Sequence, residues 1–120
     1  MLKKSLNSFG YALRGIKTTW QEENNFQIMS VITVAVLFIV FYFDFTLLES
    51  ALVVISITVV LSFEMMNTAI EDLCNKIEPN QDPVIGKIKD ISSGFVLLSS
   101  IGALIVGIIV FYSHFSYLFN

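Results

Sequence analysis

Charged residues are scarce in this sequence of 120 residues. Asp, Glu, Lys and Arg make up 14% of it, whereas hydrophobic residues make up 55%. A soluble domain carries about 25% charged residues, because its surface must be hydrated. So few charges exclude an ordinary soluble globular protein, and so much apolar content excludes a disordered chain. The composition is typical of a small integral membrane protein, and we expect residues 1–120 to form a single domain.

Cysteine and histidine occur once each, as Cys74 and His114. A single cysteine excludes an internal disulfide, a thiolate zinc cluster and a redox pair of cysteines. Neither residue has an evident partner, so neither is predicted to be a nucleophile or a metal ligand. The net charge of −3 argues against nucleic acid as a partner.

Three long apolar runs predict three membrane-spanning helices, over residues 26–43, 50–70 and 91–112. About 20 helical residues cross a hydrocarbon core of about 30 Å, because each residue advances the helix by about 1.5 Å. Asp82 followed by Pro83 predicts that the third helix already begins there, since proline suits the first helical position. The predicted fold class is an all-α membrane protein, with residues 44–49 as the hairpin between the first two spans.

The first 20 residues predict an amphipathic helix on the membrane surface. Apolar residues recur at steps of four and three from Leu2 to Trp20, which is one face of a helix. Basic residues lie mostly off that face. We therefore expect a surface helix over residues 2–20, before the first span.

No lysine or arginine occurs in the 44–49 hairpin or after residue 89. The seven basic residues precede the first span or lie between the second and third: Lys3, Lys4, Arg14, Lys17, Lys76, Lys87 and Lys89. The positive-inside rule places both of these segments in the cytoplasm. The C-terminus is then expected outside.

Polar residues interrupt the second apolar run at Glu64 and Asn67, and Glu71, Asn75 and Glu78 continue the same helical face. A charge at the bilayer centre costs about 2.5–3.5 kcal/mol, so a functional role is the default interpretation. The alternative is that Glu64 joins helices by hydrogen bonds or is hydrated near the headgroups. Two carboxylates and an amide on one face suit either a divalent cation or acid–base chemistry.

Further charged residues are expected at the cytoplasmic interface: Glu22, Glu23, Lys87, Lys89 and Asp90. Carboxylates beside lysines suit Mg²⁺ with phosphate, because carboxylates bind the metal and ammonium groups bind phosphate oxygens. Without these carboxylates, the lysines would be explained by their role in setting the orientation of the chain in the membrane.

A small cation-coupled transporter, with Glu64 as carrier, is an alternative from a different functional class. A carrier must be accessible from both sides, yet the other polar groups lie on one side of the predicted spans. This asymmetry favours an enzyme at the interface.

Small residues recur every four positions in the third span, at Ser99, Ala103 and Gly107. This spacing allows helices to pack closely. Three helices enclose a site poorly, so we expect an oligomer.

Residues 64–71, EMMNTAIE, resemble the signature E-x-x-N-S/T-A-I/V-E of the small prokaryotic diacylglycerol kinases, a family that includes the undecaprenol kinases. Gly86 with Lys89 and Asp90 resembles the G-x-x-K-D motif of the same family. The first segment contributes further similar positions: Gly10, Tyr11, Gly15, Trp20, Glu23 and Phe26.

The resemblance implies a homotrimeric kinase of the bacterial inner membrane, with active sites shared between subunits. Its partners would be ATP, the lipid bilayer and a lipid alcohol, with Mg²⁺ as cofactor. Diacylglycerol would give phosphatidic acid, and undecaprenol would give undecaprenyl phosphate.

The resemblance also implies roles for individual residues. Glu64 corresponds to the general base at the lipid alcohol, with Asn67 beside it as a further catalytic residue. Glu23 and Glu71 correspond to the metal-ligating pair at the nucleotide. The other nucleotide contacts would be Tyr11, Asn80, Gln81, Asp82, Lys89 and Asp90. Lys4 and Ser93 correspond to substrate-binding positions near the lipid or the phosphates. Many family members have Asp at position 75, so the role of Asn75 is left open.

Overall fold

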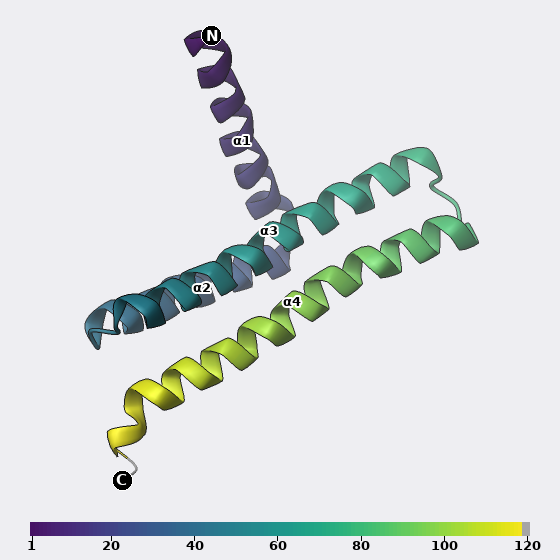
Figure 1. The fold of residues 1–120 in the computed structure, drawn as a ribbon. Coiled ribbons are helices and arrows are strands. Elements are labelled where there is room, and N and C mark those ends of the chain that lie inside the picture. The colour runs from purple at the N-terminus through teal and green to yellow at the C-terminus, as the bar shows by residue number, and fades with distance from the viewer. Residues whose placement is uncertain (119–120) are drawn as a thin grey trace.

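A computed structural model describes residues 1–118 of the chain. These residues form four α-helices and a short 3₁₀ helix. In chain order they are α1 (Leu2–Glu22), α2 (Asn24–Tyr42), α3 (Leu47–Ile77), α4 (Pro83–Phe115) and η1 (Ser116–Leu118). Helices α2 and α4 both pack against α3, whereas α1 projects away from these three (Figure 1). The all-α prediction is confirmed.

Three helices are long and apolar enough to cross a membrane: α2, α3, and α4 with its continuation to Leu118. Only 11%, 11% and 6% of the residues in their most apolar segments are buried within the chain. Their apolar side chains therefore face outwards, where lipid or another protein surface must cover them. The structure thus contains three candidate membrane spans, the number that the sequence predicts.

Helix α3 is longer than a membrane requires. Its 31 residues extend about 46 Å, whereas the 19 residues of α2 extend about 28 Å, close to the hydrocarbon thickness. The predicted second span, 50–70, lies inside this helix, which extends beyond it at both ends. The helix continues to Ile77, where Glu78 becomes extended because Pro79 follows it.

The turn between α2 and α3 is shorter than the predicted hairpin of residues 44–49. Thr46 caps α3: its hydroxyl accepts from the Glu49 N–H (3.2 Å), and the Glu49 carboxylate accepts from the Thr46 N–H (2.9 Å). This capping box starts the helix at Leu47. Asp44 makes the reversal with a positive φ of 50°, which aspartate tolerates better than most residues.

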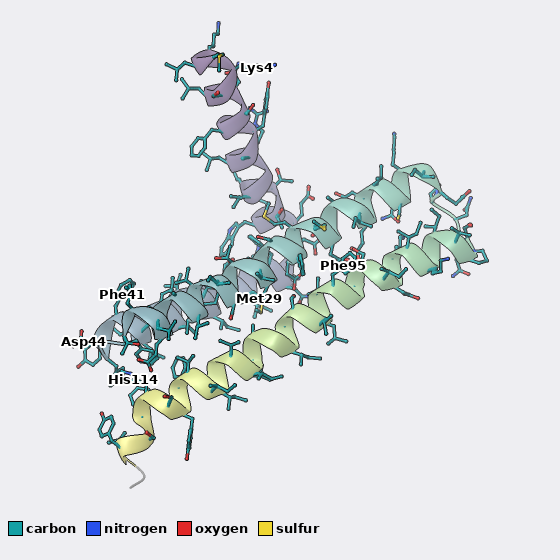
Figure 2. The ribbon with its side chains drawn as sticks, in the orientation of Figure 1. Lys4, Met29, Phe41, Asp44, Phe95 and His114 are labelled. Atoms are coloured by element: carbon teal, nitrogen blue, oxygen red, sulfur yellow. The ribbon has the colours of Figure 1, made fainter. Side chains whose placement is uncertain are left out.

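His114 has two partners near this turn, so the prediction that it lacks one is wrong. Its Nδ1 lies 3.1 Å from Glu49 Oε1, and its Nε2 lies 2.9 Å from the carbonyl oxygen of Phe43. The imidazole also stacks on Phe45, with ring centroids 3.9 Å apart. Figure 2 shows His114 beside the turn that contains Asp44. The end of α4 is thus joined to the start of α3.

The main apolar core lies at the same end of the molecule. It is formed by Val40, Phe45, Val53 and Val110, with Phe111 and Phe115 packed against them.

At the opposite end of α2, Glu23 has extended backbone geometry and separates α1 from α2. The Gln27 side chain donates to the Trp20 carbonyl oxygen (2.6 Å) across this corner.

The small residues of α4 do not bring it unusually close to another helix of the same chain. Ala103 and Gly107 line an apolar groove of about 470 Å³ between α2, α3 and α4. A Cβ atom built on Gly107 would meet no atom within 4 Å. Close packing at this stripe is therefore not a feature of the single chain.

The prediction of Pro83 as the first residue of the last helix is confirmed, with Asp82 at the N-cap.

Candidate functional site

The polar face predicted on the second span is present on α3, where Glu64, Asn67 and Glu71 are all partly buried. Glu64 lies 17 residues after Leu47, or about 26 Å along the helix axis. That distance matches the length of the antiparallel α2. The carboxylate is therefore level with the beginning of α2, close to one end of the apolar layer.

Glu23 lies at this same level, because it forms the corner between α1 and α2. Its carboxylate and that of Glu71 are both near enough to Glu64 to interact with it electrostatically. Two distant segments thus place acidic side chains within electrostatic range of Glu64. Like charges repel at this separation, so the cluster is suited to a cation or to a proton held by one member.

Asn67 is held from the neighbouring helix by a residue that sequence analysis did not select. Ser92 of α4, which is only 1% exposed, donates from its hydroxyl to Asn67 Oδ1 over 2.8 Å. The neighbouring Ser93, which was selected, is exposed and makes no such contact. The signal available in the sequence was spacing, since Ser92 follows Lys89 by three residues and so shares its helix face.

Lys89 forms a second link between α4 and α3. Its ammonium group donates a hydrogen bond to the Oδ1 atom of Asn75. The sequence left the role of Asn75 open. Because the acceptor is an amide, the contact orients the lysine side chain without neutralising its charge. Within residues 1–118, no lysine forms an ion pair with a carboxylate.

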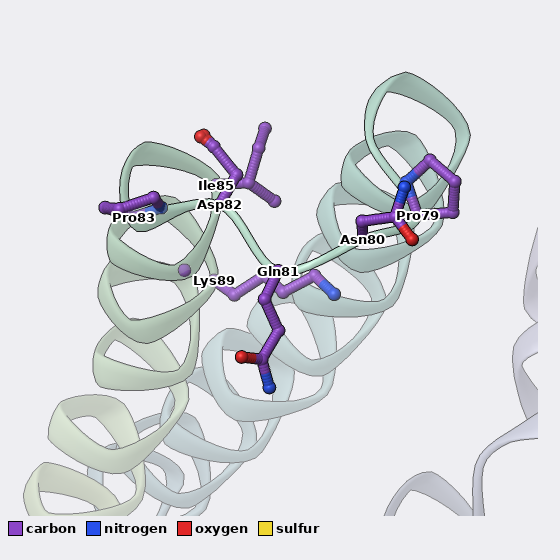
Figure 3. Close-up of a pocket in the computed structure, with 8 residues that line it drawn as sticks. Pro79, Asn80, Gln81, Asp82, Pro83, Ile85 and Lys89 are labelled. Atoms are coloured by element: carbon purple, nitrogen blue, oxygen red, sulfur yellow. The ribbon is translucent and has the colours of Figure 1, made fainter.

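Four predicted nucleotide contacts surround one groove at the turn between α3 and α4. The groove has a volume of about 610 Å³, and Figure 3 shows its lining of loop side chains together with Lys89. The predicted residues among them are Asn80, Gln81, Asp82 and Lys89. The loop is shaped by Glu78, whose carboxylate accepts from the Asn80 N–H (3.0 Å). Asp90 is exposed next to Lys89 and does not line the groove.

Tyr11 is not part of this groove. It lines a different one, of about 430 Å³ between α1 and α3, together with Arg14, Glu22 and Asp72. The Arg14 guanidinium lies 5.2 Å from the centre of the Tyr11 ring. Lys4 lies near the free end of α1, away from the helix bundle (Figure 2). A single chain therefore does not gather all the residues predicted to bind nucleotide and lipid.

Residues 10–111 match the family model of the prokaryotic diacylglycerol kinases. The chain belongs to this family. Undecaprenol kinase of Bacillus subtilis is 31% identical over 110 residues, which cover 92% of this chain and 89% of that protein.

Two further members of the family carry a different name. Diacylglycerol kinase of Escherichia coli K12 is 28% identical over 110 residues, covering 92% of this chain and 90% of the relative. Diacylglycerol kinase of Pseudomonas aeruginosa PAO1 is 29% identical over 102 residues, covering 83% of each. The chain is thus a member of a lipid kinase family, and the relatives divide between two lipid substrates.

The acidic residues carry carboxylate oxygens, which are a ligand type that Mg²⁺ accepts. Within residues 1–118, no group of three or more His, Cys, Asp or Glu side chains is arranged to enclose a metal ion. Mg²⁺ at phosphates is commonly held by one or two carboxylates, with waters and phosphate oxygens completing its six ligands. Glu23 and Glu71 supply two carboxylates of this kind, and neither forms an ion pair with a lysine.

Proposed function

We propose that this diacylglycerol kinase family member transfers the γ-phosphoryl group of ATP to the hydroxyl of diacylglycerol, giving phosphatidic acid and ADP. The observation that carries the proposal is the grouping of Glu64, Glu71 and Glu23 at the end of the apolar layer. A lipid hydroxyl and water-borne ATP both reach this level. Relatives named diacylglycerol kinase support the choice of substrate.

In this proposal the protein lies in the bacterial inner membrane. The lysine-rich loop between α3 and α4 and the N-terminus face the cytoplasm, and the C-terminus is outside. Helix α1 rests on the membrane surface with its apolar face in the lipid. Both grooves, at the α3–α4 turn and between α1 and α3, then open to the side where ATP is found.

Glu64 acts as the general base. It accepts the proton of the lipid hydroxyl as the hydroxyl oxygen forms a bond to the γ-phosphorus, and the bond from that phosphorus to the bridging oxygen breaks to release ADP. Little covalent chemistry is required of the protein, so positioning and neutralisation of charge dominate. Asn67 donates hydrogen bonds at the site, and Lys89 neutralises phosphate charge.

Glu23 and Glu71 would hold Mg²⁺ against the phosphates of ATP. When bound, the metal neutralises charge that develops on the transferring group. The nucleotide would occupy the groove of Asn80, Gln81 and Asp82, with Tyr11 and Asp90 as further contacts. Lys4 and Ser93 would face the lipid substrate.

We also propose a homotrimer with shared active sites. The separation of Tyr11 from the groove at Lys89 within one chain supports this, because a neighbouring chain can supply what each site lacks. The outward-facing apolar surfaces of the spans leave room for such contacts.

Undecaprenol is the second candidate substrate. A relative named undecaprenol kinase is 31% identical to this chain, which is as similar as the relatives named for diacylglycerol. The chemistry at Glu64 would be the same with either alcohol. The two candidates differ only in the product, phosphatidic acid or undecaprenyl phosphate.

The test is Mg²⁺-dependent transfer of labelled γ-phosphate by the purified protein in mixed micelles with each lipid. We expect label in phosphatidic acid, and a loss of at least about 100-fold in Glu64→Gln, since general bases contribute 10²–10⁴ in rate. Asp44→Asn is the matched control, because it makes the same chemical change at the opposite end of the bundle. Label only in undecaprenyl phosphate would select the second candidate.

Two other results would count against the proposal. Absence of label in both lipids, from a folded protein, would contradict a kinase and favour the cation-coupled transporter. Unchanged transfer by Glu64→Gln would remove the role of Glu64 as base while leaving the kinase itself intact.

A further inference from the structure

Ser92 uses its hydroxyl differently from the other helical serines and threonines around it. Most of these donate to a carbonyl oxygen of their own helix, three or four residues earlier: Ser30, Thr33, Ser56, Thr58, Thr68 and Ser99. Ser92 instead donates across to α3, to Asn67 Oδ1 at 2.8 Å. It is also 1% exposed, so water does not compete for this bond. A directed polar contact in a place this buried restricts the group that it reaches.

The group that it reaches is one end of a side-chain amide. An asparagine amide has an oxygen that accepts and a nitrogen that carries two donor hydrogens. With the oxygen engaged by Ser92, rotation of the amide is restricted and its nitrogen is directed elsewhere. Within residues 1–118, nothing accepts a hydrogen bond from Asn67 Nδ2, and that nitrogen is not sealed inside the protein.

The Nδ2 donor of Asn67 lies on the same helix face as two carboxylates that can accept hydrogen bonds. Asn67 is three residues after Glu64 and four before Glu71, so all three share one face of α3. Two N–H donors on this face can bind an anionic oxygen, either of a phosphate or of a carboxylate. The reverse orientation of the amide would present its oxygen to the same anions and repel them.

We infer that Ser92 is a positioning residue for phosphoryl transfer, which holds the Asn67 amide with its nitrogen towards the anionic oxygens of the site. This inference rests on the proposed kinase function and adds to it a residue of α4 with no direct contact to substrate. The acceptor is a phosphate oxygen of ATP or the Glu64 carboxylate. The two are distinguished by kinetics: loss of a contact to bound ATP raises KM for ATP, whereas loss of a contact that aligns Glu64 lowers kcat.

The experiment compares wild-type protein with Ser92→Ala and with Ser99→Ala, in the Mg²⁺-dependent transfer assay. Ser99→Ala is the matched control, because it removes a hydroxyl from the same helix that bonds only to its own backbone. We expect Ser92→Ala to lower kcat/KM about three- to tenfold, the effect of one hydrogen bond, with little change for Ser99→Ala. Thermal unfolding of both variants in micelles should shift by similar amounts.

A spectroscopic measurement follows the amide itself. The side-chain ¹⁵N–¹H signals of Asn67, assigned by their loss in Asn67→Asp, should move in Ser92→Ala and stay in place in Ser99→Ala. A merely structural role would predict loss of activity in parallel with loss of unfolding temperature, without a specific change at this amide.

Three results would overturn the inference. The first is full activity in Ser92→Ala while the wild type is active, which leaves the kinase proposal intact. The second is an unmoved Asn67 signal in Ser92→Ala. The third is a wild type without any transfer activity, which contradicts the proposed function together with this inference.

Discussion

Asn75 places a neutral acceptor beside a lysine that the proposed mechanism needs in its charged form. The amide oxygen accepts from Lys89 at the edge of the α3–α4 groove. An amide holds the side chain in place yet leaves its full positive charge for a phosphate. A carboxylate at the same place would compete with the phosphate for that charge.

We therefore predict that Asn75→Asp raises KM for ATP by about two- to fivefold, because an exposed ion pair is worth up to about 1 kcal/mol. The change in KM should shrink as salt is added, since salt screens exposed charges. Steady-state kinetics with varied ATP check this. Asn7→Asp, which adds the same charge on the exposed face of α1, is the control. Equal KM values for Asn75→Asp and wild type would show that Lys89 does not bind the nucleotide.

At the scale of elements, the helix ends explain where the sequence was informative and where it was misread. Asp82 and Pro83 marked the start of α4 correctly, because proline suits the first helical position, although the Asp82 side chain makes no capping hydrogen bond. Thr46 and Glu49 also form a visible pattern, Thr-x-x-Glu, yet the prediction left Glu49 in the hairpin. The apolar residues on either side obscured a capping box that starts the helix three residues earlier.

The contact between α4 and the α2–α3 turn should stabilise the fold. We predict that His114→Phe lowers the free energy of unfolding by about 1–3 kcal/mol, because it keeps an aromatic ring against Phe45 but loses the polar contacts of the ring nitrogens with Glu49 and with the Phe43 carbonyl oxygen. Unfolding in micelles, followed by the circular dichroism of the helices, measures the change. Tyr112→Phe, on the exposed face of the same helix, should have little effect. Identical unfolding curves for His114→Phe and wild type would contradict the prediction.

At the scale of the whole molecule, a single chain is incomplete in two respects. Its spans bury few of their apolar residues against one another. Its predicted nucleotide contacts are divided between two grooves, with Tyr11 in one and Lys89 in the other. Lipid covers apolar surface but supplies no protein side chains, and the proposed homotrimer would bring the two grooves' residues together from neighbouring chains.

The prediction from this division is subunit complementation. Tyr11→Ala and Lys89→Ala should each have low activity alone, because each removes one contact from every site. Oligomers that contain both variants should exceed the mean activity of the two pure preparations, since some of their sites combine an intact Tyr11 with an intact Lys89. Co-expression with different affinity tags and two-step purification isolates the mixed oligomers. Activity equal to the mean would indicate that each chain builds its own site.

The sequence by itself determined the features that depend on local composition and spacing. The number of spans follows from apolar runs of about 20 residues, whatever packs beside them. The shared face of Glu64, Asn67 and Glu71 follows from the helical repeat. The start of α4 follows from proline at the first helical position.

Only the tertiary structure decided which residues face one another across helices. Ser92 reaches Asn67, Lys89 reaches Asn75, and His114 reaches Glu49. Each contact depends on how α4 is rotated and shifted along α3. An apolar pattern does not encode that rotation in a membrane helix, because lipid and protein both accept apolar side chains. Burial could therefore not distinguish Ser92 from the exposed Ser93 until the two helices were seen together.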